Sequence, residues 1–286
     1  MTRRLFAKLA TMAAALAVAE CAFAYAVEDA QGTRFEFEKP PRCATVVPAI
    51  TQNIFAIGAG KYLVANSRYC DFPEDAKHRI KIGGYIDPDY EKIVSVKPEI
   101  FILPATSDSR VANRLRKLGI KCFILNGEGI ANISADVRLL GKLFGLEESA
   151  EKTAAAFDSA LKPDNSGGGR RAFFMFGRMA AGRGSFAGDL LNACGLANCA
   201  DKIGRPWAEV PREFVLAANP EIIFAEYENE KSRAETERFF RTDSVWRTTS
   251  AVKNSRIYFV PRDTVIVPSV RVAEALEIMR AFLQKN

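Results

Sequence analysis

Short apolar segments alternate with amphipathic ones along most of the chain. In the first half, apolar runs typical of buried strands span 43–47, 62–65, 100–103 and 121–125. Helical patterns at 50–57, 90–96, 111–117 and 131–144 lie between or after them. Because strands that alternate with helices form βαβ units, this half predicts a mostly parallel sheet flanked by helices.

The alternation is interrupted once and then restarts. A helix rich in Ala, Glu and Lys is predicted at 147–161, and the glycine-rich stretch 163–169 after it predicts a flexible boundary. Beyond it, strands are expected at 172–176, 222–225 and 257–260, and helices at 186–194, 212–218, 233–241 and 270–283. The predicted fold class is therefore α/β, with two lobes that each contain a mostly parallel sheet flanked by helices, bridged by one long helix. The expected divisions are an N-terminal lobe at 42–146, the bridging helix and linker at 147–169, and a C-terminal lobe at 170–286.

One local unit occurs in both halves of the chain. In each copy an aromatic residue precedes a short helix with Glu in its first turn, a proline ends the helix, and an apolar strand follows. The first copy contains Tyr85, Glu91 and Pro98, and the second contains Trp207, Glu213 and Pro220. The repetition predicts two matched lobes with a ligand held between them.

The first residues have the features of an export signal. A basic start at Arg3, Arg4 and Lys8 precedes the apolar segment 9–19, which is too short to span a bilayer comfortably. Ala22-Phe23-Ala24 fits a cleavage site, so a signal peptide is predicted at 1–24 and an exported chain from Tyr25. An uncleaved membrane anchor is the alternative. Cys21 raises the possibility of a lipoprotein, but Glu20 fits that processing signal poorly.

Charge and cysteine usage narrow the class of protein. Basic residues are spread among acidic ones, whereas nucleic-acid binding requires a concentrated basic stripe, so no nucleic-acid partner is expected. Beyond the leader, Cys194 and Cys199 lie close together across a predicted turn and are the best candidates for a disulfide; two buried thiols are the alternative. No metal site is expected, because the sole histidine, His78, sits in a charged loop without a partner histidine or an acidic cluster.

Several stretches, taken in order, resemble one known family. They are Val47-Pro48-Ala49-Ile50-Thr51, Tyr69-Cys70-Asp71-Phe72-Pro73, the segments 85–96 and 171–177, and Pro206-Trp207 with Val210-Pro211-Arg212-Glu213. From about residue 42 to 283 the chain resembles the periplasmic substrate-binding proteins of ABC importers whose two α/β lobes are joined by one long helix. Members of this family bind cobalamin, haem, ferric siderophores or metal ions, and the cobalamin-binding members are the most similar.

The resemblance implies a function and a location. The protein is expected to be a periplasmic monomer that is not an enzyme, has no intrinsic cofactor, and delivers a small-molecule ligand to a permease dimer. The expected ligand is a corrinoid, with haem or a ferric chelate as the alternative.

The predicted bridge at 147–161 is shorter than the resemblance implies, and the glycine-rich stretch after it departs from the family pattern.

The resemblance also implies ligand-binding residues. Tyr69, Tyr85 and Trp207 fall where cobalamin-binding relatives place aromatics in the cleft, and flat apolar walls suit a large planar ligand. Ordinary core or surface aromatics are the alternative. Pro48 and Ala49 begin a helix whose backbone N–H groups are expected to face a polar edge of the ligand, although simple helix capping explains them equally well.

Two further positions belong to the expected cleft. Arg178 lies in the loop 177–184, which is expected to line the cleft. This loop resembles a phosphate-binding loop only superficially, because Arg183 stands where such a loop needs Lys. Asp263 follows the last strand, at a position that often contributes to the cleft in this family. A basic residue that cobalamin binders place nearby is replaced here by an apolar one near Val267, which weakens the case for cobalamin itself.

Glu91 and Glu213, one on each lobe, match acidic positions that pair with arginines on the two permease subunits in related binding proteins. The helix dipole also favours acids in a first helical turn, and that is the structural alternative.

In a different class of function, an α/β hydrolase gains little support, because no G-x-S-x-G motif is present and the lone histidine has no partner. Within the binding class, Tyr85 or Tyr69 would serve as an axial ligand to haem.

Overall fold

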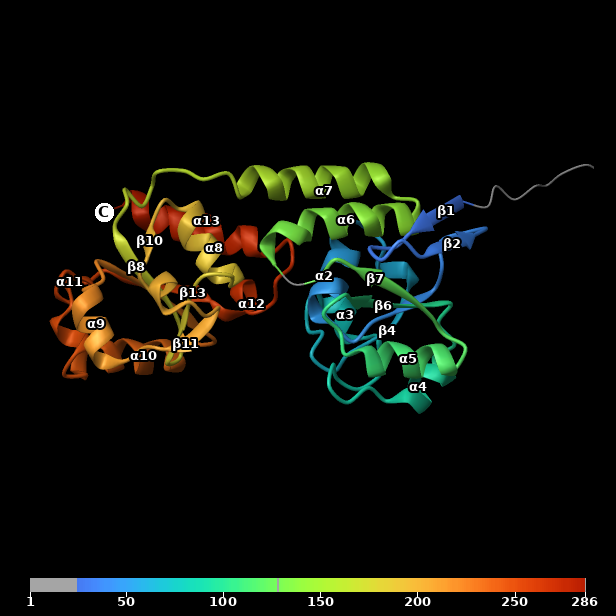
Figure 1. The fold of residues 1–286 in the computed structure, drawn as a ribbon, viewed down its shortest axis with the longest axis horizontal. Helices are drawn as coiled ribbons and strands as arrows, with labels where there is room; N and C mark the ends of the chain where they lie inside the picture. Colours follow the sequence, from blue (N-terminus) through green and yellow to red (C-terminus); the bar gives the residue numbers. More distant parts are fainter. Residues whose placement is uncertain (1–24, 128, 286) are drawn as a thin grey trace, which may run out of the picture.

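The computed structural model describes residues 25–127 and 129–285 and contains two α/β lobes side by side, with the helix α7 (Glu147–Ala160) along one edge (Figure 1). The two-lobed α/β class predicted from the sequence is confirmed. The predicted signal peptide at 1–24, with its anchor and lipoprotein alternatives, lies outside the described residues. None of the described helices is both long and apolar enough to cross a bilayer.

The N-terminal lobe is built on a five-stranded parallel sheet with the order β5-β4-β3-β6-β7. Its strands are β3 (Cys43–Ala44), β4 (Leu63–Asn66), β5 (Ile80–Lys81), β6 (Ile100–Pro104) and β7 (Lys121–Leu125), and its helices are α2 (Pro48–Ala56), α3 (Glu74–Lys77), α4 (Tyr90–Val96), α5 (Ser109–Lys117) and α6 (Ile130–Phe144). The chain runs outward in both directions from the neighbouring strands β3 and β6. In open α/β sheets, ligands bind beyond the carboxyl ends of the strands at such a switch point.

Strand β6 shows why an uninterrupted apolar run becomes a central strand. All of its residues are buried, and they alternate between two hydrophobic clusters. Ile100 and Ile102 pack with α2 and α6, whereas Phe101 and Leu103 pack with α4 and α5 on the other face of the sheet. A strand covered on both faces needs apolar residues at every position.

A hairpin precedes the predicted start of this lobe. Strands β1 (Tyr25–Glu28) and β2 (Arg34–Phe37) pair antiparallel, and their buried side chains continue the core, with the Phe35 ring 5.4 Å from the Phe123 ring. The expected lobe at 42–146 leaves this hairpin out, because two four-residue strands carry a weak alternation signal.

The bridge α7 packs against α6 and also contacts α13. Gly141 permits the close approach of α6, because a Cβ atom there would stand 2.3 Å from the Cβ atom of Ala150. At the far end of the bridge, the Arg280 guanidinium donates hydrogen bonds of 2.7 Å to the carbonyl oxygens of Ala160 and Lys162. The glycine-rich stretch that the sequence predicts to be flexible is hydrogen-bonded to its neighbours, for example from Gly167 N to Cys194 O at 2.6 Å.

The C-terminal lobe has a six-stranded sheet with the path β11-β9-β8-β12-β13, and β10 pairs with β8. Its strands are β8 (Arg171–Phe176), β9 (Met179–Ala181), β10 (Ala197–Asn198), β11 (Trp207–Glu209), β12 (Ile222–Tyr227) and β13 (Ile257–Pro261), and its helices are α8 (Phe186–Ala193), α9 (Arg212–Ala218), α10 (Glu230–Thr242), α11 (Ser250–Lys253), α12 (Arg262–Val265) and α13 (Val272–Gln284). Strand β9 pairs antiparallel with both β8 and β11. Because β9 lies within the segment 177–184, this segment is not simply a loop. Gly177, with φ of 56°, provides the tight turn from β8 into β9.

The predicted disulfide between Cys194 and Cys199 is absent: both residues are free, buried thiols. Cys194 packs in the cluster that contains α13, and Cys199 packs in the cluster around Phe173 and Trp246. The short strand β10 lies between the two cysteines, and their side chains enter separate hydrophobic clusters.

Candidate ligand site between the lobes

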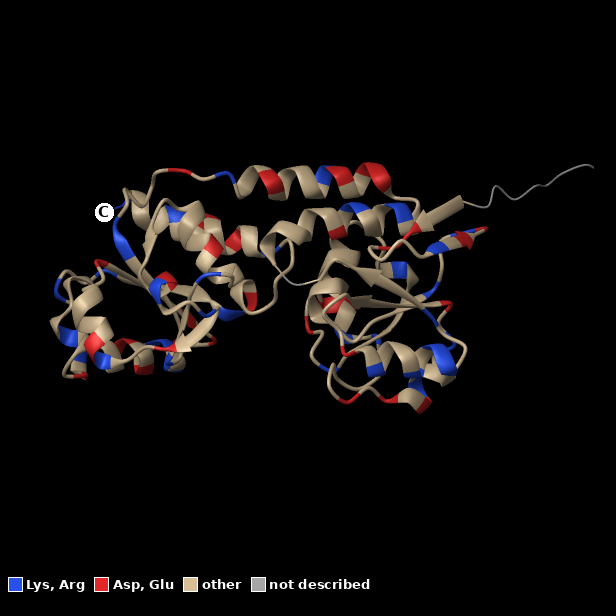
Figure 2. Ribbon diagram, in the orientation of Figure 1, with Lys and Arg blue, Asp and Glu red and all other residues tan. Residues whose placement is uncertain are grey.

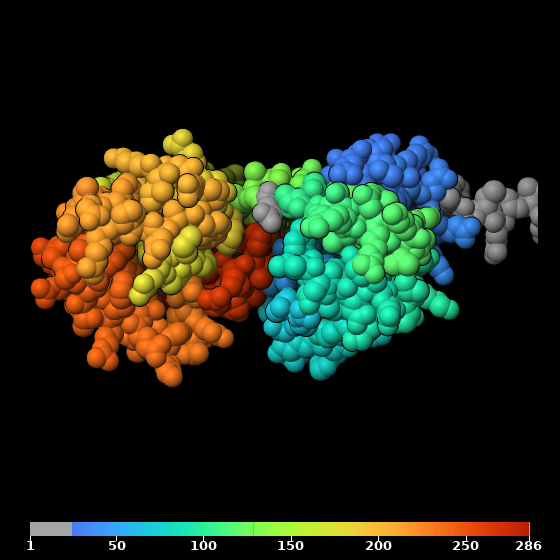
Figure 3. Space-filling model, turned by 60° about the horizontal axis from the view of Figure 1, so that its bottom comes forward, coloured from blue at the N-terminus to red at the C-terminus, as the bar shows by residue number. Residues whose placement is uncertain are grey.

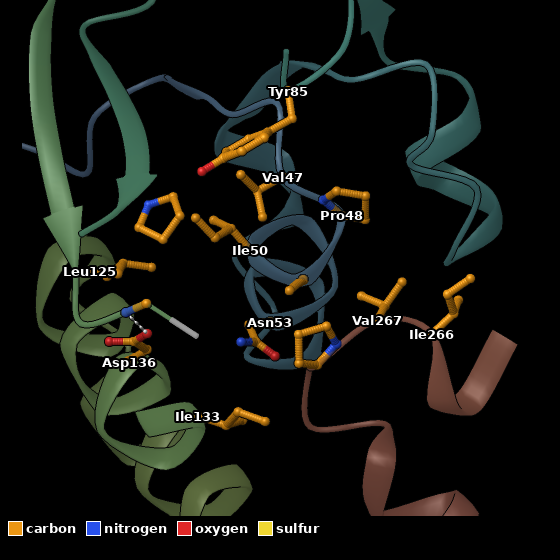
Figure 4. Close-up of a pocket in the computed structure, with 14 residues that line it drawn as sticks. Val47, Pro48, Ile50, Asn53, Tyr85, Leu125, Ile133, Asp136, Ile266 and Val267 are labelled. Atoms are coloured by element: carbon orange, nitrogen blue, oxygen red, sulfur yellow. Dashed lines mark hydrogen bonds between the residues drawn. The ribbon is translucent and has the colours of Figure 1, made fainter. Parts of the chain in front are cut away.

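A pocket of about 210 Å³ lies where the N-terminal lobe meets the segment 266–268 of the C-terminal lobe (Figure 4). In the space-filling view a groove separates the two lobes, and C-terminal segments drawn in red lie beside it (Figure 3). The pocket is lined by Val47, Pro48, Ala49, Ile50, Asn53, Tyr85, Pro104, Leu125, Gly127, Ile133, Asp136, Ile266, Val267 and Pro268. It therefore sits beyond the carboxyl ends of β3, β6 and β7, at the switch point of the sheet.

The pocket wall is mainly apolar. Val47, Ile50 and Leu125 come from the N-terminal lobe, and Val267 stands opposite them (Figure 4). The expected residues Pro48, Ala49 and Tyr85 are all brought together here. An apolar wall with few polar groups suits a ligand with a large hydrophobic face.

A tight turn positions Tyr85. Gly83 has φ of 89°, and Arg68 N donates to Gly83 O at 3.0 Å. The Arg68 guanidinium also pairs with the Asp87 carboxylate at 2.5 Å, which joins the turn to the preceding loop. This charged hydrogen bond lowers the pKa of Asp87.

Tyr69 lies beside the same turn but does not line the pocket. Its side chain is 59% exposed, and the Arg68 guanidinium stacks 5.1 Å from its ring centre. Gly84 makes room for this arrangement, because a Cβ atom there would stand 3.1 Å from Cε2 of Tyr69.

Asp136 is a polar lining residue that the sequence reasoning missed. Its carboxylate accepts hydrogen bonds from Asn126 N at 2.8 Å, Asn126 Nδ2 at 2.7 Å and Gly127 N at 3.3 Å. Burial raises the pKa of Asp136 despite these hydrogen bonds. The only signal in the sequence is an acid within the apolar helical pattern at 131–144, eleven residues after the end of β7.

Direct contacts hold the two lobes together beside the pocket. Ser269 Oγ donates to Gln52 Oε1 at 2.5 Å, and Val270 N donates to Asn53 Oδ1 at 3.1 Å. Gln52 and Asn53 belong to α2, which also contributes Pro48 and Ile50 to the pocket. These bonds place the 266–268 wall against α2.

Asp263 lies next to this junction and is engaged within its own lobe. Its carboxylate pairs with Arg271 at 3.1 Å, and Arg271 also pairs with Glu274 at 3.1 Å. The Arg271 guanidinium stacks 3.7 Å from the ring centre of Phe72 in the other lobe. Asp263 does not line the pocket, and the structure shows it beside the lobe junction.

Trp207 and Arg178, both expected in the cleft, lie at the antiparallel edge of the C-terminal sheet. Trp207 is the first residue of β11, and its ring packs edge-on against Phe176 with the ring centres 5.0 Å apart. Trp207 is 36% exposed. Arg178 lines a separate hollow with Glu209 and Arg212. Neither residue lines the pocket between the lobes.

Glu91 and Glu213 lie in the first turns of α4 and α9, and both are exposed. Within the described residues, neither carboxylate forms an ion pair or a side-chain hydrogen bond. Basic and acidic segments alternate over both lobes (Figure 2), so these two carboxylates lie on a surface of mixed charge.

The described residues contain no cluster of three or more His, Cys, Asp or Glu side chains arranged to hold a metal ion. His78 is exposed, and its Nε2 atom lies 3.9 Å from Glu74.

The sequence profile described as "Periplasmic binding protein" matches residues 44–264. This chain belongs to the periplasmic binding protein family. The binding protein is 31% identical over 191 residues to the vitamin B12-binding protein of Salmonella choleraesuis, covering 64% of this chain and 71% of the relative. It is 24% identical over 255 residues to that of Vibrio cholerae, covering 85% and 89%.

Solved structures share the fold of this binding protein. The periplasmic vitamin B12-binding protein of Vibrio cholerae superposes with a TM-score of 0.70 at 23% identity, over 86% of this chain and 98% of that one. The apo periplasmic heme-binding protein of Roseiflexus sp. RS-1 superposes with a TM-score of 0.71 at 20% identity, over 85% and 98%. Because binders of different ligands fit equally well, fold similarity does not distinguish between the ligands.

Proposed function

We propose that this protein captures a corrinoid, such as cobalamin, between its lobes in the periplasm and delivers it to the permease dimer of an ABC importer. The proposal rests on the apolar pocket at the switch point, which Tyr85, Pro48 and Ala49 line together with Val267 and Pro268. The similarity to vitamin B12-binding proteins supports the choice of ligand. The pocket is smaller than a corrinoid, so it would hold one edge of the ligand while the rest extends into the open groove (Figure 3).

Titration with cyanocobalamin tests the ligand. Intrinsic fluorescence should report saturable binding, and Tyr85→Ala should weaken it by at least ~1 kcal/mol, because an aromatic wall of the pocket is lost. We expect a comparable loss for Trp207→Ala if the bound ligand extends across the groove to β11. Unchanged affinity in both variants would place the ligand elsewhere.

Haem or a ferric chelate is the second candidate. The Tyr85 phenol supports it, because its oxygen lies at the pocket edge, 3.4 Å from Ser107 Oγ, and phenolate oxygen is an axial ligand to iron. The visible spectrum of protein exposed to each candidate separates them. A Soret band indicates haem, a corrinoid spectrum indicates cobalamin, and a weak charge-transfer band indicates a ferric chelate.

We further propose that Glu91 and Glu213 dock the protein on the permease. Each is exposed and lacks a partner among the described residues, and each lobe carries one. The Glu91→Ala, Glu213→Ala double variant should bind ligand normally but fail to support uptake, because such charges at the edge of an interface govern partner choice. Uptake equal to that of the unaltered protein would contradict this assignment.

The exported state is part of the proposal. We expect the leader to be removed at Ala24, so that the periplasmic form begins at Tyr25. Mass spectrometry of the protein isolated from the periplasm gives the first residue directly.

A further inference from the structure

The helices α4 and α9 are matched residue by residue. When Glu91 is aligned with Glu213, Ile93 aligns with Val215 and both are fully buried. Each helix ends with a non-glycine residue in the left-handed conformation, Lys97 with φ of 47° and Asn219 with φ of 38°, followed by a buried proline. Both helices therefore present corresponding positions to solvent.

A matched arginine holds the end of each helix. Arg42, just before β3, donates hydrogen bonds to Val96 O at 3.0 Å and Lys97 O at 3.2 Å. Arg171, at the start of β8, donates to Ala218 O at 3.0 Å and Asn219 O at 3.1 Å.

A glutamate completes each of these arrangements. The backbone N–H of Arg42 donates to Glu99 Oε2 at 2.8 Å, and that of Arg171 donates to Glu221 Oε2 at 3.1 Å. In each lobe, therefore, an arginine at the start of a strand, β3 or β8, holds the end of the helix, α4 or α9. The solvent-facing surfaces of the two helices thus have the same orientation relative to that strand.

The outer surface of each helix carries an aliphatic side chain next to its free carboxylate. Val94 is 43% exposed and Leu216 is 52% exposed, and each lies three residues after the glutamate. Residues three apart are neighbours on a helix surface. Each lobe thus presents the same pair, one acid and one aliphatic residue.

We propose that Val94 and Leu216 form the apolar half of the docking surface, each packing beside the salt bridge made by Glu91 or Glu213. The occupant is a two-fold symmetric permease that presents, at two equivalent positions, a basic side chain beside an apolar surface. The unpaired carboxylates call for a basic partner, and the duplication of the pair calls for a partner with two equivalent sites. This inference rests on the docking role proposed above for the glutamates.

The test measures binding of the ligand-free protein to its permease–ATPase complex in lipid nanodiscs by biolayer interferometry. The Val94→Ser, Leu216→Ser double variant should bind at least tenfold more weakly, because both apolar contacts are lost. The single variants Val94→Ser and Leu216→Ser should each weaken binding to the permease, and the two factors should be similar to each other. Cyanocobalamin affinity and the melting temperature should be unchanged in all of them.

The matched control is Ile80→Ser, Leu118→Ser, which removes aliphatic residues that are 53% and 46% exposed outside the two helices. It should bind the permease like the unaltered protein. An equal loss in this control, or a loss from only one of the single variants, would overturn the inference.

The glutamate variant separates the two proposals. Weak binding by Glu91→Ala, Glu213→Ala with full binding by the serine pair would leave the docking role standing and refute the apolar half. Full binding by both double variants would refute the docking role itself. A loss confined to the serine pair would overturn the inference as stated, because no salt bridge would then lie beside the apolar contact.

Discussion

At the scale of single residues, two adjacent glycines carry different constraints in the turn that presents Tyr85. A Cβ atom at Gly83 would meet backbone atoms, with Asp87 O at 2.5 Å, and φ there is 89°. The three atoms nearest to a Cβ atom at Gly84 would all belong to side chains: Asp87 Oδ1 at 2.6 Å, Tyr69 Cε2 at 3.1 Å and Arg68 Nη2 at 3.2 Å. Side-chain ends move at small cost, whereas backbone does not.

The two alanine variants should therefore separate stability from binding. Gly83→Ala should lower the free energy of unfolding by about 1–3 kcal/mol through backbone strain. Gly84→Ala should leave that free energy nearly unchanged but weaken ligand binding, because the Arg68–Asp87 pair beside Tyr85 is displaced. Urea denaturation and ligand titration measure the two effects, and equal destabilisation by both variants would contradict this distinction.

The buried thiols also make a prediction at this scale. Burial raises the pKa of Cys194 to about 12 and that of Cys199 to about 11, so both remain protonated and unreactive at pH 8. A thiol reagent should react with neither in the native protein. After denaturation without reductant, a chain that begins at Tyr25 should show five free thiols. Three would indicate a disulfide.

At the scale of elements, Asp243 anchors the start of α9. Its carboxylate accepts hydrogen bonds from Val245 N at 2.9 Å and Trp246 N at 3.1 Å, and it pairs with Arg212, the first residue of the helix. Burial alone would raise the pKa of Asp243, but these hydrogen bonds outweigh it and lower the pKa.

A lowered pKa in the folded state means that the ionised carboxylate stabilises the fold above the unfolded-state pKa of about 3.9, and that this contribution is lost as the pH falls through the folded-state pKa. The difference in unfolding free energy between the unaltered protein and Asp243→Asn should therefore be largest near neutral pH and shrink below about pH 4. Denaturation curves across this range measure it. A difference that grows in acid would have the wrong sign.

The arginines at the ends of α4 and α9 make a second prediction about elements. Arg42→Met or Arg171→Met should each lower the free energy of unfolding by about 1 kcal/mol, because exposed carbonyl oxygens at a helix end lose their donors. The similar contacts of the two arginines lead us to expect similar losses in the two lobes. Thermal melts measure both, and a large loss in only one variant would show that the two contacts are not equivalent.

At the scale of the whole molecule, the relation between the lobes depends on a few contacts between distant parts of the chain. Ser269 and Gln52 are both buried where α2 meets the C-terminal lobe. Ser269→Ala would leave Gln52 Oε1 without its donor and should lower the free energy of unfolding by about 1–3 kcal/mol.

The same variant should broaden the distribution of distances between the lobes in small-angle X-ray scattering, since one of the bonds that fix the 266–268 wall is gone. Ser95→Ala provides the control, because Ser95 is exposed on α4 and its hydroxyl donates within that helix, to Lys92 O at 2.8 Å. It should change stability by less than about 0.5 kcal/mol. Equal scattering profiles for all three proteins would show that the Ser269–Gln52 bond is not needed to set the lobe positions.

Local sequence patterns determined the elements and their class. Uninterrupted apolar runs identified β6 and β7, because a strand buried on both faces has no room for polar residues. The prolines after α4 and α9 marked where each helix ends, since proline disfavours helix at the residue before it. The short strands β1, β2, β9 and β11 were missed because three or four residues carry too little periodicity.

Only the tertiary structure decided which of the expected residues share a site. Tyr85, Pro48 and Ala49 meet in the pocket because their segments follow β5 and β3 of one parallel sheet, whereas Trp207 and Arg178 lie on the antiparallel edge of the other sheet and do not line the pocket. The opposite wall depends on a hydrogen bond between Gln52 and Ser269, residues 217 positions apart. Periodicity reports which face of an element is buried, but a contact at that separation arises only when the lobes pack together.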